Sequence, residues 1–288
     1  MYEIQASEVT DLVYSLFLKA NRILPPGLKK TIEEAGARET APLAKQAFSD
    51  IIRNAELAAE KSMPICQDCG LAVVFAEVGQ DVHIAGGGFR EAIDEGVRRA
   101  YKDGYLRKSV VTDPLFNRKN SGDNTPAVIH WNITDGHDLG ITVSPKGMGS
   151  ENMSRIYMLK PADGVTGVIN AAVEAVKLAG PNPCPPIVLG IGIGGNFETV
   201  ALAAKRALVR EDGVRNPDSQ YAELEQEILK RVNELGIGPG GYGGRTTALD
   251  VRIEKLPTHI AGMPMAVNIC CHALRHAAGK IEGRLCNG

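Results

Sequence analysis

The 288-residue sequence lacks any long run of apolar residues and any marked excess of one charge. No apolar stretch approaches the roughly 20 residues that a membrane-spanning helix needs, and the first residues show no charged-then-apolar export pattern. Lysine and arginine number 32 against 34 aspartates and glutamates, and neither sign forms a block. These absences predict a cytoplasmic protein that binds neither nucleic acid nor membranes.

Aromatic residues are also scarce, at 5% of the chain, so the core is expected to be mainly aliphatic. A chain of this length buries roughly three quarters of its unfolded surface and needs no disulfide or structural metal to hold a core. The cysteines are therefore expected to be reduced thiols, ligands or nucleophiles. They are Cys66, Cys69, Cys184, Cys270, Cys271 and Cys286.

Before Pro64, apolar residues recur at three- and four-residue spacing, which is the spacing of one helix face. The first such helix is predicted to start near Ser7, whose hydroxyl would cap it, and Pro25-Pro26-Gly27 would end it. A short helical piece is expected to reach Gly36, and a long helix is expected from about Thr40. The first sixty residues are thus predicted to be helical.

After Pro64 the pattern changes to short apolar runs bounded by turn-forming residues, which predict strands. These runs are residues 71–78, 127–133, 139–143, 187–193 and 248–253. The turn at Asp135-Gly136 predicts that the second and third runs pair as a hairpin. Helices are predicted at residues 89–101, 161–178 and 198–209 and after Asp218, which would cap the last one.

The sequence therefore predicts a mixed α/β (α+β) fold, with an N-terminal helical layer and a largely antiparallel sheet packed with helices. The helical layer would comprise residues 1–62, and residues 63–288 would form the α/β part that carries the cysteines. Because no internal repeat and no convincing linker is present, a single domain over residues 1–288 is expected.

The glycines from Gly190 to Gly195 follow the pattern G-x-G-x-x-G between a predicted strand and a predicted helix. This pattern can bind a dinucleotide, but the fingerprint also requires a second strand that ends in an acid, and a polar loop follows here instead. Close packing of a strand against a helix is the commoner reason for such glycines. A third interpretation is that the N–H groups of Gly194, Gly195 and Asn196 bind a carboxylate or sulfide at the helix start.

The stretch from Met63 to Gly70 places Cys66 beside an amide, a carboxylate and a second thiol, Cys69, in a helix-to-strand turn. By itself, this C-x-x-C pattern could be a redox pair or half of a zinc site. No second C-x-x-C follows, and no thioredoxin-like βαβ pattern precedes it. Cys184 is held between prolines, and Cys271 follows another cysteine; either could instead be an ordinary buried thiol.

Five motifs occur together and in order. They are Ile65-Cys66-Gln67-Asp68-x-Gly70, Lys146-Gly-Met-Gly-Ser-Glu-Asn152, Cys184-Pro-Pro186 before a glycine-rich strand, Gly238-Pro-Gly-Gly-x-Gly-Gly244, and Leu256-Pro-x-His259 followed by Cys271-x-x-x-Arg275. From about Ala41 to the C-terminus, the sequence resembles the class I, iron–sulfur fumarate hydratases. It is similar to the α subunit of their two-subunit form, shared with L-tartrate dehydratase, and to the N-terminal region of their single-chain form.

The resemblance implies a 4Fe–4S cluster, held by Cys66, Cys184 and Cys271 in residues 63–288. One iron would then have no protein ligand and could act as a Lewis acid toward the hydroxyl and one carboxylate of the substrate. The resemblance favours Cys271 over the adjacent Cys270 as the third ligand, because its spacing to Arg275 and to Pro264 fits the family pattern. Cys69 stands where the family commonly has threonine, so its role stays open.

The resemblance also implies the residues that handle a four-carbon dicarboxylate. Gln67 and Asp68 would contact the substrate, with Asp68 as a catalytic proton carrier. Arg107 would pair with a substrate carboxylate, for which its planar guanidinium is suited. Gly149 would approach the substrate through its backbone, and His259 would be a second catalytic residue that modulates that acid.

The expected function is the interconversion of fumarate and L-malate by the cluster-bearing α subunit of a hydro-lyase. The alternative within this chemistry is an L-tartrate dehydratase α subunit that forms oxaloacetate. From other classes, the alternatives are an iron–sulfur or zinc protein with a redox or sensing role and a partner subunit without activity. The family's β portion supplies further active-site residues, so a separate β subunit, in a higher oligomer such as α2β2, is expected to be required.

Overall fold

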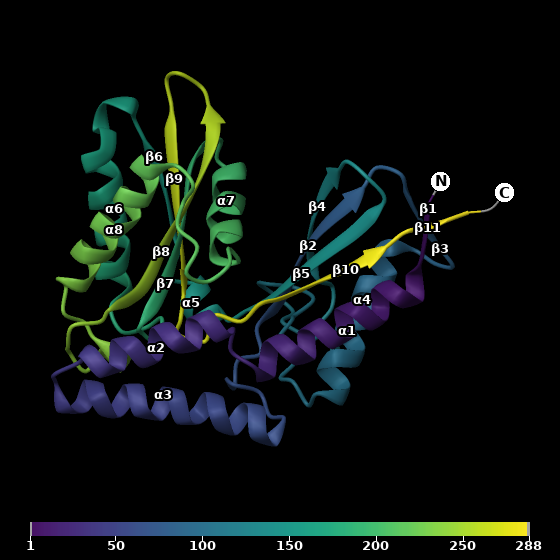
Figure 1. The fold of residues 1–288 in the computed structure, drawn as a ribbon, viewed down its shortest axis with the longest axis horizontal. Helices are drawn as coiled ribbons and strands as arrows, with labels where there is room; N and C mark the ends of the chain where they lie inside the picture. The colour runs from purple at the N-terminus through teal and green to yellow at the C-terminus, as the bar shows by residue number, and fades with distance from the viewer. Residues whose placement is uncertain (1, 287–288) are drawn as a thin grey trace. The chain divides into compact units, whose positions relative to one another are not determined.

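The computed structural model describes residues 2–286, and the predicted mixed α/β class is confirmed. The chain divides into two compact units (Figure 1). Unit 1 comprises Met1–Pro25, Ala55–Gly147 and Arg275–Gly288, and unit 2 comprises Pro26–Asn54 and Met148–Leu274. The predicted helical layer therefore contributes residues to both units, and the single domain stays a prediction. No helix in the described residues is both long and apolar enough to cross a membrane.

Unit 1 is built on a four-stranded sheet with the order β10-β5-β2-β4 and a small sheet with the order β11-β1-β3. The helices α1 and α4 pack on each other, and α1 also packs on β5 and β10. Their apolar faces, with Phe17 and Val97 fully buried, join the inner faces of the strands in one aliphatic core. The elements are β1 (Tyr2–Gln5), α1 (Ala6–Arg22), β2 (Leu71–Gly79), β3 (Val82–Ala85), α4 (Phe89–Asp103), β4 (Val128–Thr134), β5 (Asp138–Lys146), β10 (Ala277–Glu282) and β11 (Arg284–Leu285).

The predicted hairpin between β4 and β5 is wrong, because β2 lies between these two strands. β2 pairs in parallel with β4 and antiparallel with β5. The connection from β4 to β5 passes the end of β2, where the N–H of Gln80 donates to Thr134 O at 2.8 Å and that of Asp81 donates to Gly136 O at 3.1 Å. A turn signal between two apolar runs could not show that a third strand would insert between them.

The N-cap of α1 is Gln5 rather than the predicted Ser7, because the helix begins at Ala6, two residues earlier than a helix capped by Ser7 would begin. The N–H of Gln5 donates to Glu8 Oε2 at 3.1 Å, so the carboxylate of Glu8 satisfies the backbone donor of the N-cap residue. The predicted cap of helix α8 (Ser219–Asn233) is confirmed, since Asp218 Oδ1 accepts the N–H of Gln220 at 3.1 Å.

Unit 2 is built on a sheet with the order β6-β9-β7-β8. In Figure 1, α6 and α8 cover one face of this sheet and α7 covers the other. Each of the three sheets in the described residues combines one parallel pair with antiparallel pairing. The elements are α2 (Pro26–Arg38), α5 (Met148–Glu151), β6 (Arg155–Leu159), α6 (Gly164–Ala179), β7 (Ile187–Gly195), α7 (Thr199–Leu208), α8 (Ser219–Asn233), β8 (Ala248–Thr258) and β9 (Met263–Cys270); α3 (Pro42–Lys61) begins in unit 2 and ends in unit 1.

The glycines of the G-x-G-x-x-G pattern allow a strand to pack closely on a helix. A Cβ atom at Gly190 would lie 2.1 Å from the carbonyl oxygen of Ala204, and one at Gly192 would lie 2.2 Å from that of Val200, both in α7. Both glycines lie inside β7, and α8 follows α7 before the next strand. The N–H of Asn196 is bonded to Thr199 Oγ1 at 2.9 Å. The close-packing interpretation is therefore confirmed for Gly190 and Gly192.

A buried carboxylate joins two distant segments of unit 2. Glu39 is 2% exposed and accepts the N–H groups of Thr40 at 2.8 Å, Ala41 at 3.4 Å and Arg245 at 2.8 Å. Burial alone would raise the pKa of Glu39, but these N–H groups outweigh burial and hold the pKa below its ordinary value of 4.5. Glu39 thus fixes the chain that follows α2 to the end of the glycine-rich segment 238–244.

We expect Glu39→Gln to lower the free energy of unfolding at neutral pH by roughly 1.5–3 kcal/mol, because charge-assisted hydrogen bonds are lost. A carboxyl whose pKa is lower in the folded state stabilises the fold above its unfolded pKa, and that contribution is lost as the pH falls through the folded pKa. In urea unfolding, the difference in unfolding free energy between the two proteins should therefore shrink as the pH falls below 4.5, the ordinary pKa of a glutamate.

The matched control for this prediction is Glu33→Gln, which removes a half-exposed carboxylate that pairs with Lys29 across one helix turn at 3.6 Å. Such a pair contributes little, so this variant should differ from the parent by less than about 0.5 kcal/mol. A Glu39→Gln effect that is equally large near neutral pH and in acid would contradict the assigned charge.

Candidate active site

The turn between α3 and β2 carries the first predicted thiol in a fixed conformation. The N–H of Asp68 donates to Cys66 Sγ at 3.4 Å, and the N–H of Gly70 donates to Asp68 Oδ1 at 2.9 Å. Gly70 has φ of +76°, and a Cβ atom there would lie 2.6 Å from the carbonyl carbon of Lys146. Only glycine fits this position. Cys66 is partly exposed, and the side chain of Gln67 is exposed.

The start of this turn is held by a buried arginine and a buried asparagine. Arg275 is 2% exposed, and its Nη1 donates to Asn21 Oδ1 at 3.2 Å. The carbonyl of Asn21 accepts the N–H of Ile65 at 2.8 Å. A Cβ atom at Gly147 would lie 3.1 Å from Asp68 Oδ2 and 3.6 Å from Arg275 Nη2. The carboxylate of Asp68 and the guanidinium of Arg275 thus both border Gly147.

Arg107 reaches the same turn through its backbone. It lies in the segment after α4, its side chain is exposed, and its N–H donates to Cys69 Sγ at 3.2 Å. Cys69 is 1% exposed, and burial raises the pKa of its thiol. The Arg107 N–H acts against this shift without cancelling it. Cys66 and Cys69 therefore face different surroundings, one toward solvent and one toward the core of unit 1.

Unit 2 brings the other two predicted thiols to one end of its sheet. Val188 in β7 is paired with Cys270 in β9, so the turn before β7 and the residues after β9 are neighbours. His272 Nδ1 lies 3.0 Å from the carbonyl oxygen of Cys184, and the N–H tautomer at this atom donates to it. Cys184 has φ of +55°, and its side chain is exposed. Cys271 and Cys184 are thereby linked through His272.

The glycine-rich segment 238–244 supports the turn that carries Cys184. The N–H of Gly240 donates to Pro185 O at 2.8 Å. A Cβ atom at Gly241 would lie 2.5 Å from Pro181 Cβ. This fourth motif of the sequence therefore serves to position a thiol.

The chemistry of the three thiols fits an iron–sulfur cluster. Within residues 2–286 no cysteine forms a disulfide bond, and Cys66, Cys184 and Cys271 are each at least partly exposed, whereas Cys270 is 4% exposed within β9. Exposed thiols can become the thiolates that ligate iron. Cys66 belongs to unit 1, and the other two belong to unit 2. Within residues 2–286, no group of three or more His, Cys, Asp or Glu residues is gathered as a metal site.

Two further predicted residues, Gly149 and His259, also belong to unit 2. Gly149 is exposed in α5, whose Glu151 bonds to Lys205 and, at 2.7 Å, to Asn268. His259 is exposed after β8, and its Nδ1 accepts the N–H of Ala261 at 3.1 Å. The 11 residues of β8 span on the order of 30 Å and start at the sheet end that carries the thiols. His259 thus lies at the opposite end.

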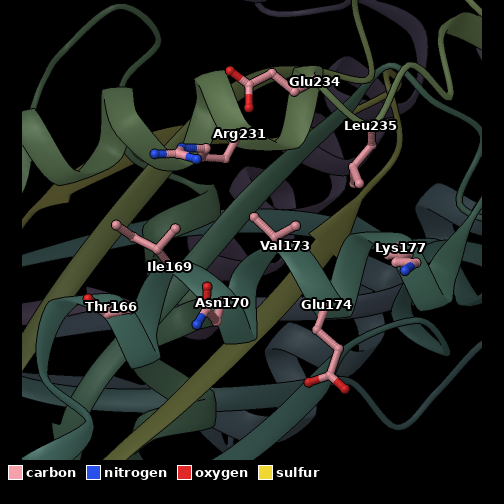
Figure 2. Close-up of a pocket in the computed structure, with 9 residues that line it drawn as sticks. All are labelled: Thr166, Ile169, Asn170, Val173, Glu174, Lys177, Arg231, Glu234 and Leu235. Carbon is pink, nitrogen blue, oxygen red and sulfur yellow. The ribbon is translucent and has the colours of Figure 1, made fainter.

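A cavity of about 660 Å³ opens between α6 and α8 (Figure 2). Its walls mix apolar side chains with charges of both signs, and none of the predicted site residues lines it. Figure 2 shows the lining residues, which are Thr166, Ile169, Asn170, Val173, Glu174, Lys177, Arg231, Glu234 and Leu235.

Sequence reasoning did not identify three residues that position these groups. They are His272, Tyr101, whose hydroxyl lies 2.6 Å from the carbonyl oxygen of Cys69, and Asn124, whose amide donates to the carbonyl of Gly70 at 3.1 Å. His272 is adjacent to a predicted ligand, and that adjacency was the available signal. Asn124 has φ of +65°, which asparagine tolerates better than most residues. Nothing in the local pattern marks the buried Tyr101 hydroxyl, because its partners are distant in sequence.

Unit 1 thus presents the thiol of Cys66 in one turn with an amide and a carboxylate, and unit 2 presents two further thiols at one end of its sheet. A family model described as fumarate hydratase (fumerase) matches residues 10–280, so the chain belongs to the fumarate hydratase family, as the resemblance indicated.

Similar proteins extend over almost the whole chain. One from Methanocaldococcus jannaschii, named "Putative L(+)-tartrate dehydratase subunit alpha", is 40% identical over 280 residues, covering 96% of this chain and 98% of that protein. The L(+)-tartrate dehydratase subunit alpha of Escherichia coli strain K12 is 29% identical over 283 residues, covering 97% of this chain and 92% of that protein. The subunit of the same name from Shigella sonnei has the same identity and coverage.

We expect Gly241→Ala to lower the free energy of unfolding by about 2–4 kcal/mol in urea unfolding. A methyl group would overlap Pro181, at roughly 1–3 kcal/mol, and φ of +80° adds about 1 kcal/mol for alanine. The matched control is Gly236→Ala, since Gly236 has φ of +64° but no heavy atom within 4 Å of the added Cβ. Equal losses in the two variants would show that the contact with Pro181 is unimportant.

Proposed function

We propose that this chain is the cluster-bearing α subunit of a hydro-lyase that acts on a four-carbon dicarboxylate. The observation that carries the proposal is the turn in which a partly exposed thiol, Cys66, precedes Gln67 and Asp68. Membership of the fumarate hydratase family supports it. In this proposal Cys66, Cys184 and Cys271 ligate a 4Fe–4S cluster, and the chain works in the cytoplasm.

When bound, a cluster with one open iron supplies Lewis-acid chemistry toward a substrate hydroxyl. The side chains of this chain then bind the substrate and hold a proton. Gln67 donates to a substrate oxygen through its amide, and the guanidinium of Arg107 pairs with a carboxylate. Asp68, whose Oδ1 accepts the N–H of Gly70, holds the proton. Gly149 offers its exposed backbone to the substrate.

Fumarate and L-malate are the first substrate pair that we propose, in keeping with the family. L(+)-tartrate is the second candidate, because the relatives compared above are named L(+)-tartrate dehydratase subunit alpha. The two reactions share one chemistry, the loss of water from a dicarboxylate, in which a hydroxyl leaves one carbon and a proton leaves the adjacent carbon. The description of those relatives as subunits supports the proposal that a separate β subunit completes the active site.

The proposed catalytic role of His259 requires an assembly with more than one copy of this chain. Because it lies at the opposite end of its own sheet from Cys184 and Cys271, it can reach these thiols only from another copy of the chain. An assembly that contains two copies, such as α2β2, meets this condition.

A zinc or redox site at Cys66 and Cys69 is the less favoured alternative. Cys69 is buried, and its thiol lies between the carbonyl of Cys66, at 3.7 Å, and the N–H of Arg107. A paired ligand or redox partner would instead have to be available to a metal or a second thiol.

We expect Cys271→Ser to lose bound iron and Cys270→Ser to retain it. Cys271 is partly exposed after β9, whereas Cys270 is buried in the strand. The measurement is the iron content and visible absorption of each protein after anaerobic reconstitution. A full cluster in Cys271→Ser together with a loss in Cys270→Ser would reassign the ligand.

Activity is expected only after anaerobic reconstitution with a β subunit, because part of the family's active site lies outside this chain. The complex would be assayed on fumarate, L-malate and both enantiomers of tartrate, with the cluster-loaded chain alone as the control. Turnover of fumarate by the isolated chain at the rate of the complex would contradict the need for a partner. A complex that acts on none of these substrates would contradict the proposed function.

A further inference from the structure

Three buried side chains tie the turn of Cys66 to the segment of Arg107 in unit 1. Cys69, Tyr101 and Asn124 are each at most 1% exposed. They come from the turn itself, from α4 and from the segment before β4, respectively. Each makes hydrogen bonds to backbone groups of another segment, so together they connect stretches of chain that local sequence does not join.

The thiol of Cys69 bridges two backbones. It donates to the carbonyl of Cys66 at 3.7 Å and accepts the N–H of Arg107 at 3.2 Å. A thiol can do both, because sulfur is a weak acceptor and S–H a weak donor. The N–H of Arg107 would lower the stability of the fold if it were buried without an acceptor, and the sulfur of Cys69 supplies that acceptor.

Tyr101 and Asn124 bind the same turn through its backbone carbonyl groups. Tyr101 Oη lies 2.6 Å from the carbonyl oxygen of Cys69 and 3.1 Å from that of Gly70. Asn124 Nδ2 donates to the Gly70 carbonyl at 3.1 Å, and Asn124 Oδ1 accepts the N–H of Ser109 at 2.7 Å. The turn and residues 107–109 are thus joined at both ends of the segment.

We propose that Cys69 is a positioning residue that holds the backbone of Arg107 next to the turn carrying Gln67 and Asp68. Asn124 fixes the same segment two residues further on, at Ser109. The inference rests on the proposed function for the role of Arg107. The two thiols of the C-x-x-C pattern then have different roles. Cys66 faces solvent, where it can serve as a ligand, and Cys69 faces inward and orders the segment of the carboxylate-binding arginine.

The test compares Cys69→Thr with Cys69→Val, because the two side chains have nearly the same shape and only threonine keeps a donor and an acceptor. In the reconstituted complex, Cys69→Val is expected to raise KM for the dicarboxylate about tenfold with kcat changed less than about twofold, since ground-state binding is weakened. Cys69→Thr is expected to behave as the parent. A Cys69→Val complex with the parent's KM would overturn the inference.

Hydrogen exchange of the full chain gives a readout that does not depend on activity. The amide of Arg107 is expected to exchange about tenfold faster in Cys69→Val than in the parent or Cys69→Thr, with or without iron. If Cys69→Val does not fold, Asn124→Gly serves instead, because glycine tolerates φ of +65° and removes both side-chain bonds. The Ser109 amide should then exchange faster, and unchanged exchange in that variant would overturn the inference.

The two readouts separate this inference from the proposed function. A parent complex without activity on any four-carbon dicarboxylate would refute the function, while the exchange rates would still decide whether Cys69 orders the Arg107 segment. Faster exchange with an unchanged KM would show that the segment is ordered by Cys69 but that its order does not serve substrate binding, which also overturns the proposal.

Discussion

The close approach of Gly70 to the backbone of Lys146 is the constraint on which the candidate site in unit 1 depends. β2 and β5 pair with Leu71 opposite Lys146, so the chain must turn away directly before that pair and has no room for a side chain. This forced turn exposes Cys66 and Gln67 and directs Cys69 into the core. The position of the chemical groups is therefore a consequence of strand register.

Unit 2 uses register in a similar way to gather residues that are distant in sequence. Antiparallel pairing of β7 with β9 places the residues before one strand beside those after the other, which brings Cys184 next to Cys271 and His272. The glycine-rich segment 238–244 then packs on the turn of Cys184. Motifs that are separate in the sequence thus become one local structure at the end of a sheet.

Most helices and the longer strands could be predicted from the sequence because their signals are local periodicities. The hairpin prediction failed because the position of β2 depends on pairing between distant segments, which a turn signal does not contain. Short strands such as β1 and β6 carry too few residues for a period. The proposed ligand residues were indicated by the family resemblance and not by local patterns, and the contact of Cys69 with Arg107 could not be predicted because it joins residues 38 apart in sequence.

The two faces of β7 differ in how well they can accommodate substitutions. The isoleucines and Leu189 point to α6 and α8, where side chains interdigitate and can repack around a gain or loss of a methyl group. On the opposite face, Gly190 and Gly192 let the backbone of α7 approach directly. The side chains that pack on that face form only a small cluster of Val200, Ala204 and Ala266, so the backbone contacts at the two glycines set how closely α7 lies on the sheet.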